Sequence, residues 1–280
     1  MVGAHFMNEL KPPPFGQQWE QMLSRNGRWE QLTEAMQTKL PPFTDAPNTW
    51  TSALPPAYHL TNWITERSVA YLRDHQERPF VLWASYPDPH QPFDCPEPWA
   101  HLHRPEEVDL PRERTRDLER RPWWHRAALE GIPTTKDPVI KKFLMTQARK
   151  PQPTDEQLRH IIANYYGMIS FIDHGVGHVL EILDDLGLRE NTLVVFSTDH
   201  GEWLGDHGLL LKGPMHYEGL LRVACMMQGP GIPAGRVVRD PVSTLDLPAT
   251  FLDHAGLAEA APWHSRSLRP LIEQEGASRD

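Results

Sequence analysis

The sequence lacks several features that would assign it to a broad class of proteins. Only 2 of its 280 residues are cysteines, which is too few for a disulfide framework. No apolar stretch reaches the about 18 residues that a membrane-spanning helix needs, so we expect no membrane partner. Basic residues are also scarce, since 28 lysines and arginines stand against 37 acidic residues and the net charge is −9. Such a charge argues against a nucleic-acid partner.

Proline is abundant where cysteine is rare, and its distribution outlines the domain organisation. The 28 prolines and 10 tryptophans indicate long, ordered loops rather than disorder. Residues 1–55 are interrupted by proline and are expected to be mostly loop, with a short helix around Trp19 to Leu23. Residues 56–275 are expected to form one α/β domain portion, with an excursion rich in Pro, Arg and Trp at about 94–153. The first residues show no secretory signal, so a true start at Met1 would indicate the cytoplasm.

The first predicted helix is amphipathic. Apolar residues recur at helical spacing from Leu60 to His75, and we expect Leu60, Ile64, Ala70 and Leu72 on its buried side.

A longer helix is bounded by signals at both ends. Thr154 and Gln157 form a capping-box pattern at its start, and one apolar stripe continues until Gly187 ends the helix. A further helix is predicted after Asp246, which is expected to cap it, and Gly256 lies past its end.

Apolar, β-branched runs predict strands at Phe80–Ser85, Leu193–Phe196 and Val223–Met227. The order of strand, long helix and strand supports a βαβ unit whose strands have parallel neighbours. The run that ends at Phe196 is expected to be a buried strand.

The strand that ends at Phe196 leads directly into residues suited to chemistry. Asp199 and His200 follow it, and α/β sheets build their sites at the carboxyl ends of strands. Adjacent side chains on an extended chain point to opposite faces, so both reach one ion only if the chain turns there. We expect Gly201 to supply that freedom. A carboxylate suits calcium or magnesium, whereas an imidazole favours manganese or zinc.

These residues belong to a longer pattern. The run Ser-Thr-Asp-His-Gly-Glu-x-x-Gly-Asp-His-Gly at residues 197–208, followed by Lys212, resembles the second-half signature of the sulfatases, within the alkaline-phosphatase-like superfamily. Further segments are similar to parts of sulfatases: residues 79–93, 165–177, 228–232 and 243–253. The resemblance covers about residues 56–275. It implies an α/β fold with a mixed, largely parallel sheet flanked by helices, of which this chain holds a part.

The resemblance also implies roles for particular residues. Sulfate-ester cleavage develops charge on nonbridging and leaving oxygens, so a site needs a cation, positive side chains and a proton donor. Asp199 and His200 are the implied metal ligands, and Lys212 is the implied sulfate-binding cation. His90, in a loop stiffened by prolines, is expected to bind the anion or to protonate the leaving oxygen. The family resemblance implies calcium. Many arylsulfatases have a similar motif with Asn at the position of His200, and the histidine of this chain leaves manganese or zinc open.

Other polar residues are weaker candidates. Glu202 is expected either to orient the metal ligands or to have no such role. Structural rather than catalytic roles are expected for Asp206, His207, His216, Asp173 and His174. Cys95 and Cys225 are expected to serve as small hydrophobic residues.

One motif of the family is missing from this sequence. Sulfatases carry Cys-x-Pro-x-Arg or Ser-x-Pro-x-Arg, whose first residue becomes a formylglycine nucleophile, and neither cysteine nor any serine here fits it. We therefore expect a sulfatase-like hydrolase of small-molecule sulfate esters that lacks the front of the family and its nucleophile. Two alternatives stay open: a phosphonate or phosphate monoester hydrolase of the same superfamily, and a truncated, non-catalytic product. Oligomerisation is left open as well.

Overall fold

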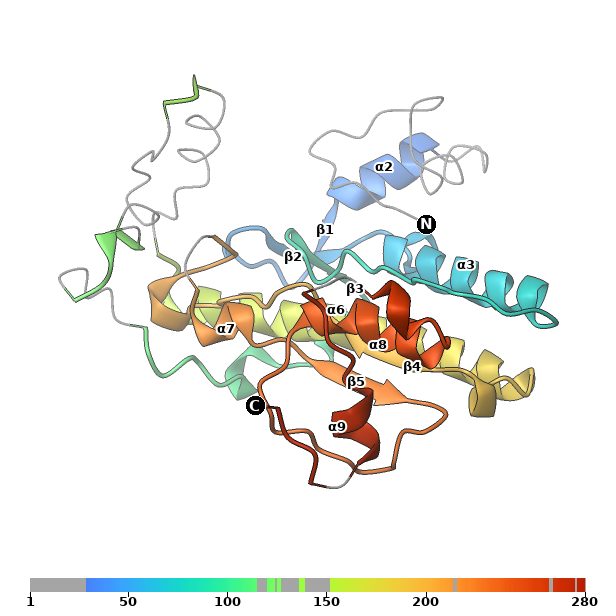
Figure 1. Ribbon diagram of the computed structural model, residues 1–280. Coiled ribbons are helices and arrows are strands. Elements are labelled where there is room, and N and C mark those ends of the chain that lie inside the picture. Colours follow the sequence, from blue (N-terminus) through green and yellow to red (C-terminus); the bar gives the residue numbers. More distant parts are fainter. Residues whose placement is uncertain are drawn as a thin grey trace. The chain divides into compact units, whose positions relative to one another are not determined.

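A computed structural model of the 280-residue chain describes residues 29–114, 120–123, 125–126, 136–138, 152–213, 216–261, 264–274 and 276–279. The chain divides into two compact units, and Figure 1 labels the main helices and strands. Unit 1 consists of Met1–Leu186 and Glu202–Gly219, and unit 2 consists of Gly187–Gly201 and Leu220–Asp280. The helix expected around Trp19 to Leu23 lies outside the described residues, as does much of the excursion expected at 94–153.

Unit 1 combines a small sheet with long helices. Its elements are α2 (Trp29–Gln37), β1 (Lys39–Leu40), β2 (Thr49–Ser52), η1 (Pro56–Tyr58), α3 (Leu60–His75), β3 (Phe93–Pro96), η2 (Trp99–His101), η3 (Pro105–Glu107), α6 (Asp155–Asp185) and η5 (Asp206–Gly208). The strand order is β1-β2-β3, with β1 antiparallel to β2 and β2 parallel to β3. A parallel pair needs a crossover, and here the crossover contains α3. The parallel βαβ connection of the described residues is therefore β2–α3–β3.

Helix α3 has the bounds predicted from the sequence, but its buried face is more polar than predicted. Ile64 and Leu72 are buried as expected, together with Trp63, whereas Leu60 and Ala70 are only half-buried. The additional buried residues are Thr61, Thr65 and Ser68. The hydroxyls of Thr65 and Ser68 each donate to the helix carbonyl four residues earlier, at 3.1 and 2.8 Å, so they can be buried without losing a hydrogen bond.

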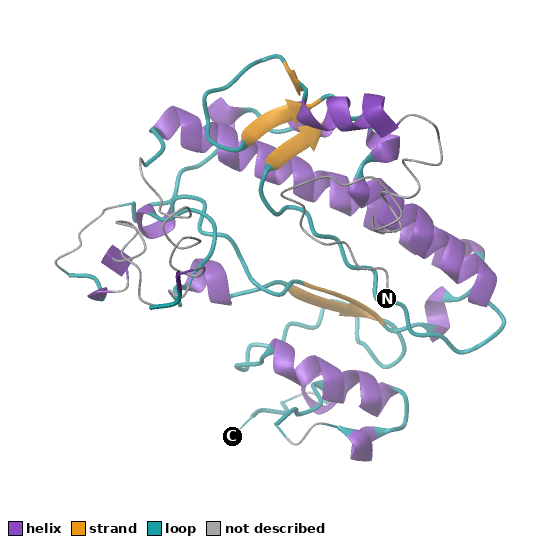
Figure 2. Cartoon of the chain, turned by 90° about the horizontal axis from the view of Figure 1, so that it is seen from above, coloured by secondary structure: helices purple, strands orange, loops and turns teal. Residues whose placement is uncertain are grey.

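Helix α6 begins and ends where the sequence indicates. The Thr154 hydroxyl accepts a hydrogen bond from the amide of Gln157, whose side chain in turn accepts from the Thr154 amide, so the capping box is confirmed. Gly187 follows the C-cap with φ of +65°, in the left-handed region. The helix packs on α3, β2 and β3, and it is the long helix that runs beside the sheet in Figure 2.

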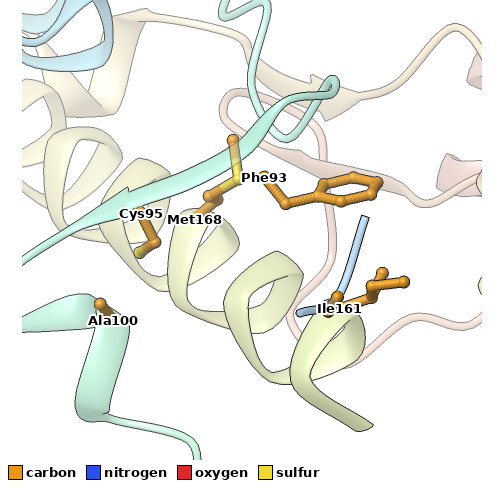
Figure 3. Close-up of a cluster of buried hydrophobic side chains, with 6 residues drawn as sticks. Phe93, Cys95, Ala100, Ile161 and Met168 are labelled. Carbon is orange, nitrogen blue, oxygen red and sulfur yellow. The ribbon is translucent and has the colours of Figure 1, made fainter. Parts of the chain in front are cut away.

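The core of unit 1 forms where α6 meets β3 and η2. Phe93 and Cys95 of β3 and Ala100 of η2 pack with Ile161 and Met168 of α6 (Figure 3). The excursion expected at about 94–153 therefore begins within the core, because Cys95 and Ala100 belong to it. Cys95 behaves as the small hydrophobic residue that was predicted, whereas Cys225 in unit 2 is exposed.

A buried amide ties α6 to the parallel strands. The Asn164 side chain donates to the carbonyl oxygens of Trp50 on β2 and Phe93 on β3, both at 2.9 Å. Because both acceptors are backbone atoms, this residue sets the position of the helix on the pair of strands independently of their side chains.

Unit 2 is built around a two-stranded ribbon. Its elements are η4 (Arg189–Asn191), β4 (Val194–Ser197), β5 (Cys225–Gln228), η6 (Thr244–Asp246), α8 (Leu247–His254), η7 (Ala258–Ala260) and α9 (Arg269–Glu273), while α7 (Glu218–Leu221) spans the boundary between the units. Strands β4 and β5 are antiparallel, with Val194 opposite Gln228. A hydrophobic cluster forms around α9, with Leu268, Leu271 and Ile272 buried.

Three predictions for the strands and for the cap of α8 need correction. Strand β4 is confirmed, but its described partner is the antiparallel β5, and Phe196 is exposed rather than buried. The segment Phe80–Ser85 is not a strand, and its side chains Val81 and Trp83 are 92% and 66% exposed. Among the described residues, no strand pairs with it, and an apolar pattern alone does not supply the hydrogen-bond partner that a strand requires. Helix α8 is confirmed, but the Asp246 side chain accepts from the Ser243 and Arg266 amides instead of capping it.

Among the described helices, none combines the length and the apolar character needed to cross a membrane.

Candidate functional site

In unit 2, the chain turns sharply as it leaves β4, and this turn presents Asp199 and His200. The Thr198 hydroxyl donates to the His200 carbonyl at 3.0 Å, and the His200 amide donates to Oδ1 of Asp199 at 2.9 Å. The Gly201 amide donates to the carbonyl of Leu220 at 2.8 Å. Gly201 is not among the glycines with positive φ, so the turn is closed by side-chain hydrogen bonds rather than by a left-handed glycine, contrary to expectation.

The turn brings the two predicted metal ligands close to one another. Nε2 of His200 lies 3.7 Å from Oδ2 of Asp199, and the Asp199 side chain is 85% exposed. Nδ1 of His200 is 2.7 Å from the carbonyl oxygen of Gly201. Because a carbonyl oxygen only accepts, Nδ1 carries the proton in the neutral ring and Nε2 presents its lone pair. Such a hydrogen bond from the second ring nitrogen is the usual support of a metal-binding histidine.

This donor pair fits part of a divalent-metal site. Metal–ligand bonds of about 2.0–2.2 Å to nitrogen and oxygen allow one ion to bridge donors that are 3.7 Å apart. Within the described part of the chain, however, no group of three or more His, Cys, Asp or Glu side chains is arranged to hold a metal. Asp199 and His200 are two possible donors, and a complete coordination sphere would need further ligands.

In unit 1, the glycine-containing loop after residue 201 holds Lys212 against Glu202. Nζ of Lys212 lies 3.3 Å from Oε2 of Glu202, whose carboxylate is only 3% exposed. The Trp203 amide donates to Oε1 of the same carboxylate at 3.2 Å. A charge with so little solvent access needs a partner of opposite sign, and Lys212 supplies it. Glu202 was expected either to orient the metal ligands or to have no such role, and in the structure it contacts Lys212 and the Trp203 amide.

The shape of this loop depends on left-handed residues. Gly205 and Gly208 have φ of +95° and +70°. A Cβ at Gly205 would come within 2.5 Å of Cδ2 of Leu158 on α6, so glycine is needed there for space as well as for conformation. The loop therefore lies close against α6, which fixes the approach of Lys212.

His90 lies in the loop between the extended segment 80–85 and β3. Its amide donates to the Pro87 carbonyl at 3.1 Å, and Nδ1 lies 2.6 Å from the carbonyl oxygen of Gln91. By the argument used for His200, the neutral ring of His90 carries its proton on Nδ1. The side chain is half-buried, so the ring is held by its own loop and still reaches solvent.

The weaker candidates occupy varied positions. Oδ2 of Asp206 lies 3.7 Å from Nε2 of His207, and the His207 ring stacks on Tyr217 with 3.9 Å between ring centroids. His216 is exposed, and Asp173 and His174 lie on the exposed side of α6. These contacts fit the structural roles expected from the sequence.

The predicted residues fall into separate groups. Lys212 and His90 belong to unit 1, whereas Asp199 and His200 belong to unit 2. Sequence reasoning missed the buried His59 and Thr61 at the start of α3 and their partner in the His90 loop, Asp88, whose side chain is 14% exposed. Asp88 precedes His90 by only two positions, but neither its partner Thr61 nor the burial of that partner has a signal in the sequence.

Comparison with known proteins gives a consistent result. The family model for sulfatases matches residues 15–257. An arylsulfatase of Clostridium perfringens is 31% identical over 225 residues, which are 79% of this chain and 43% of the relative. A multifunctional protein of the alkaline phosphatase superfamily from Trinickia caryophylli is 28% identical over 248 residues, covering 84% of this chain and 45% of the relative. The chain spans less than half the length of these relatives.

The structural comparison agrees on the fold. A phosphonate monoester hydrolase from Silicibacter pomeroyi superposes with a TM-score of 0.75 and 24% identity, over 92% of this chain and 50% of that one. The predicted alkaline-phosphatase-like α/β fold is therefore confirmed.

Proposed function

Because the chain belongs to the sulfatase family, we propose that it takes part in the metal-dependent hydrolysis of small-molecule sulfate esters. The observation that carries this proposal is the turn after β4, where Asp199 and His200 lie together with Nε2 of His200 oriented by the Nδ1 hydrogen bond. That arrangement suits a cation ligand better than a packing residue. The relatives named above support the reaction class.

Each residue has its own proposed role, as the resemblance to sulfatases implies. Asp199 and His200 would hold the cation, which would supply positive charge for the nonbridging oxygens. Lys212 binds a sulfate oxygen, with Glu202 limiting the positions of its ammonium group. His90, when protonated, donates from its ring to the leaving oxygen or binds the anion.

The identity of the metal is a finer question. Sulfatases as a family generally use a divalent metal. Calcium is our first expectation from that resemblance, and the imidazole of His200 makes manganese or zinc the alternatives. With two ligands from this turn, we expect the chain to bind such ions more weakly than about 1 μM.

Calorimetry with calcium and with manganese tests the ligand pair. Asp199→Ala should abolish the weak binding, while Asp206→Ala, another aspartate close to a histidine, should leave it unchanged. Submicromolar binding that survives Asp199→Ala would place the metal elsewhere.

Ligand binding and turnover test the substrate class. Inorganic sulfate should bind to the 280-residue chain, with a dissociation constant raised about tenfold by Lys212→Ala. Lys136→Ala, which removes an exposed lysine, should have no effect.

Turnover of p-nitrophenyl sulfate is expected below about a thousandth of that of a relative with the formylglycine motif, because losing a nucleophile costs about 10³ to 10⁶ in rate. Preference for a phosphonate ester over the sulfate would favour the alternative hydrolase.

A further inference from the structure

The loop that carries His90 is attached to the start of α3 by buried polar side chains. Oγ1 of Thr61 donates a hydrogen bond to Oδ2 of Asp88, and Nδ1 of His59 lies 3.7 Å from the same oxygen. One turn further along α3, the hydroxyl oxygens of Thr65 and Tyr86 are 3.1 Å apart. The helix therefore holds the loop at two points on the N-terminal side of His90.

These contacts are shielded from water. Thr61, Thr65 and His59 are all buried, and the Asp88 side chain is 14% exposed. A carboxylate in such a place must be hydrogen-bonded, since an unsatisfied one would favour a loop that opens into solvent. Threonine also offers little to a helix interior, so the burial of Thr65 inside α3 is better explained by its contact with the loop. The same explanation fits Thr61, which is buried in the first turn and donates to Asp88.

The imidazole of His59 does not cancel the charge of Asp88. Burial lowers the pKa of His59, and this outweighs the opposite influence of nearby Asp88 and of the backbone at Asp94. A neutral ring contributes a dipole and packs beside the carboxylate. The hydrogen bond from Thr61 is thus the principal direct contact that α3 makes with the Asp88 carboxylate.

We propose that Thr61 and Asp88, with His59 packed beside them, are positioning residues that hold the His90 imidazole in one orientation for the anion. Asp88 and His90 flank Pro89, and the His90 amide donates a hydrogen bond to the Pro87 carbonyl. A loop fixed at Asp88 therefore leaves His90 little freedom. Orientation of this kind has large effects, because a displacement of about 1 Å can cost about a hundredfold in a reaction. This positioning role rests on the function proposed for His90, but a different experimental result would refute each of the two.

Nuclear magnetic resonance of the 280-residue chain labelled at histidine Cε1 tests the positioning. The His90 signal is assigned by its loss in His90→Ala. Thr61→Val removes the hydroxyl at nearly constant volume and should split or broaden that signal, whereas Thr61→Ser should restore one sharp signal. Ser68→Ala is the matched control, since its buried hydroxyl on the same helix donates to the Ile64 carbonyl.

Asp88→Ala provides a second variant that leaves α3 intact. It should disturb the His90 signal as Thr61→Val does, and it keeps the test valid if the buried valine prevents folding. An unchanged His90 signal in a folded Thr61→Val or Asp88→Ala chain overturns the proposal.

Titration with inorganic sulfate then separates the two ideas. We expect sulfate to bind about tenfold more weakly to Thr61→Val, and Thr61→Val/His90→Ala to bind no more weakly than His90→Ala alone, because Thr61 acts through His90. If the losses of sulfate affinity caused by Thr61→Val and His90→Ala added up in the double variant, the positioning role would be overturned. If sulfate leaves the His90 signal unmoved while Thr61→Val still splits it, the function proposed for His90 fails and the positioning role stands.

Discussion

At the scale of single residues, the protein holds its candidate groups with different firmness. The Glu202 carboxylate is almost inaccessible and is paired with Lys212, while Asp199 projects into solvent beside His200. A buried ion pair is fixed because separating it leaves an uncompensated charge. The proposed anion-binding lysine is therefore held in place by its own ion pair, whereas the proposed metal ligand Asp199 is mostly exposed.

The ion pair should respond asymmetrically to substitution. Lys212→Met leaves the buried Glu202 carboxylate without its cation and is expected to cost about 3 kcal/mol in the free energy of unfolding. Glu202→Gln leaves a lysine that is 23% exposed and can turn to solvent, so we expect a loss of only about 1 kcal/mol. Urea unfolding measures both, and Lys212→Met/Glu202→Gln should recover most of the larger loss. Equal costs for the two single variants would contradict this account.

His59 should make the protein sensitive to acid. Its pKa is lowered below the ordinary 6.5, chiefly by burial, so below pH 6.5 the unfolded chain binds more protons than the folded chain. The contribution of His59 is therefore present above pH 6.5 and is lost as the pH falls through the folded pKa. His59→Gln should flatten the decline in unfolding free energy that begins as the pH falls through about 6.5.

A matched substitution at an exposed histidine controls for general effects of acid. His101→Gln removes a ring that lies on the surface near Glu97, and it should leave the slope of stability against pH close to that of the wild type. If His59→Gln and His101→Gln gave the same slope, burial of His59 would not be the cause.

At the scale of elements, α6 organises unit 1 because its small residues let other elements approach closely. A Cβ at Gly167 would lie 2.5 Å from the Trp99 carbonyl oxygen and 2.9 Å from Sγ of Cys95. A Cβ at Gly175 would lie 2.4 Å from Oγ1 of Thr65 on α3. Both positions have φ outside the left-handed region, so glycine is needed there for space alone.

Two alanine substitutions in α6 should have opposite effects. Gly167→Ala forces backbone apart and is expected to destabilise the protein by about 1–3 kcal/mol. Gly177→Ala places its Cβ in open space in the same helix and should stabilise by about 0.5–1 kcal/mol, since alanine loses less backbone freedom on folding. Thermal unfolding of both variants gives the comparison, and a stabilising Gly167→Ala would mean that η2 does not pack as closely as described.

At the scale of the whole molecule, each unit has its own hydrophobic cluster, yet large apolar side chains stay exposed. Unit 1 is built around Ile161 and Met168, and unit 2 around Leu271 and its neighbours. Val81 and Trp83 project from an extended segment that is paired with no described strand. Unpaired extended backbone with apolar side chains is a site of association between chains.

We expect the chain to self-associate through this segment. Size-exclusion chromatography with light scattering should show a mass above the 32.2 kDa of one chain, and Val81→Lys/Trp83→Lys should lower it. Val237→Lys, at an apolar residue of unit 2 that is as exposed as Trp83, is the control and should have little effect. A monomer that melts cooperatively in the wild type would contradict the prediction.

The sequence foretold the elements whose signals are local. The capping box at Thr154, the left-handed Gly187 and the helical periodicity of α3 depend on neighbours within one or two turns, so they could be recognised without a structure. The strand at Phe80–Ser85 could not be judged in the same way, because a run of apolar residues shows that a strand is suitable but not that a partner is present.

The same division holds for the candidate site. The sequence by itself determined the family, the helix bounds of α3 and α6, and the chemical types at Asp199, His200, Lys212 and His90. Only the tertiary structure decided that Glu202 pairs with Lys212 and that Thr61 holds Asp88, 27 positions away. Such pairs arise when the folding of loops brings distant residues together and excludes water from them. The local sequence around each residue predicts neither the contact nor its burial.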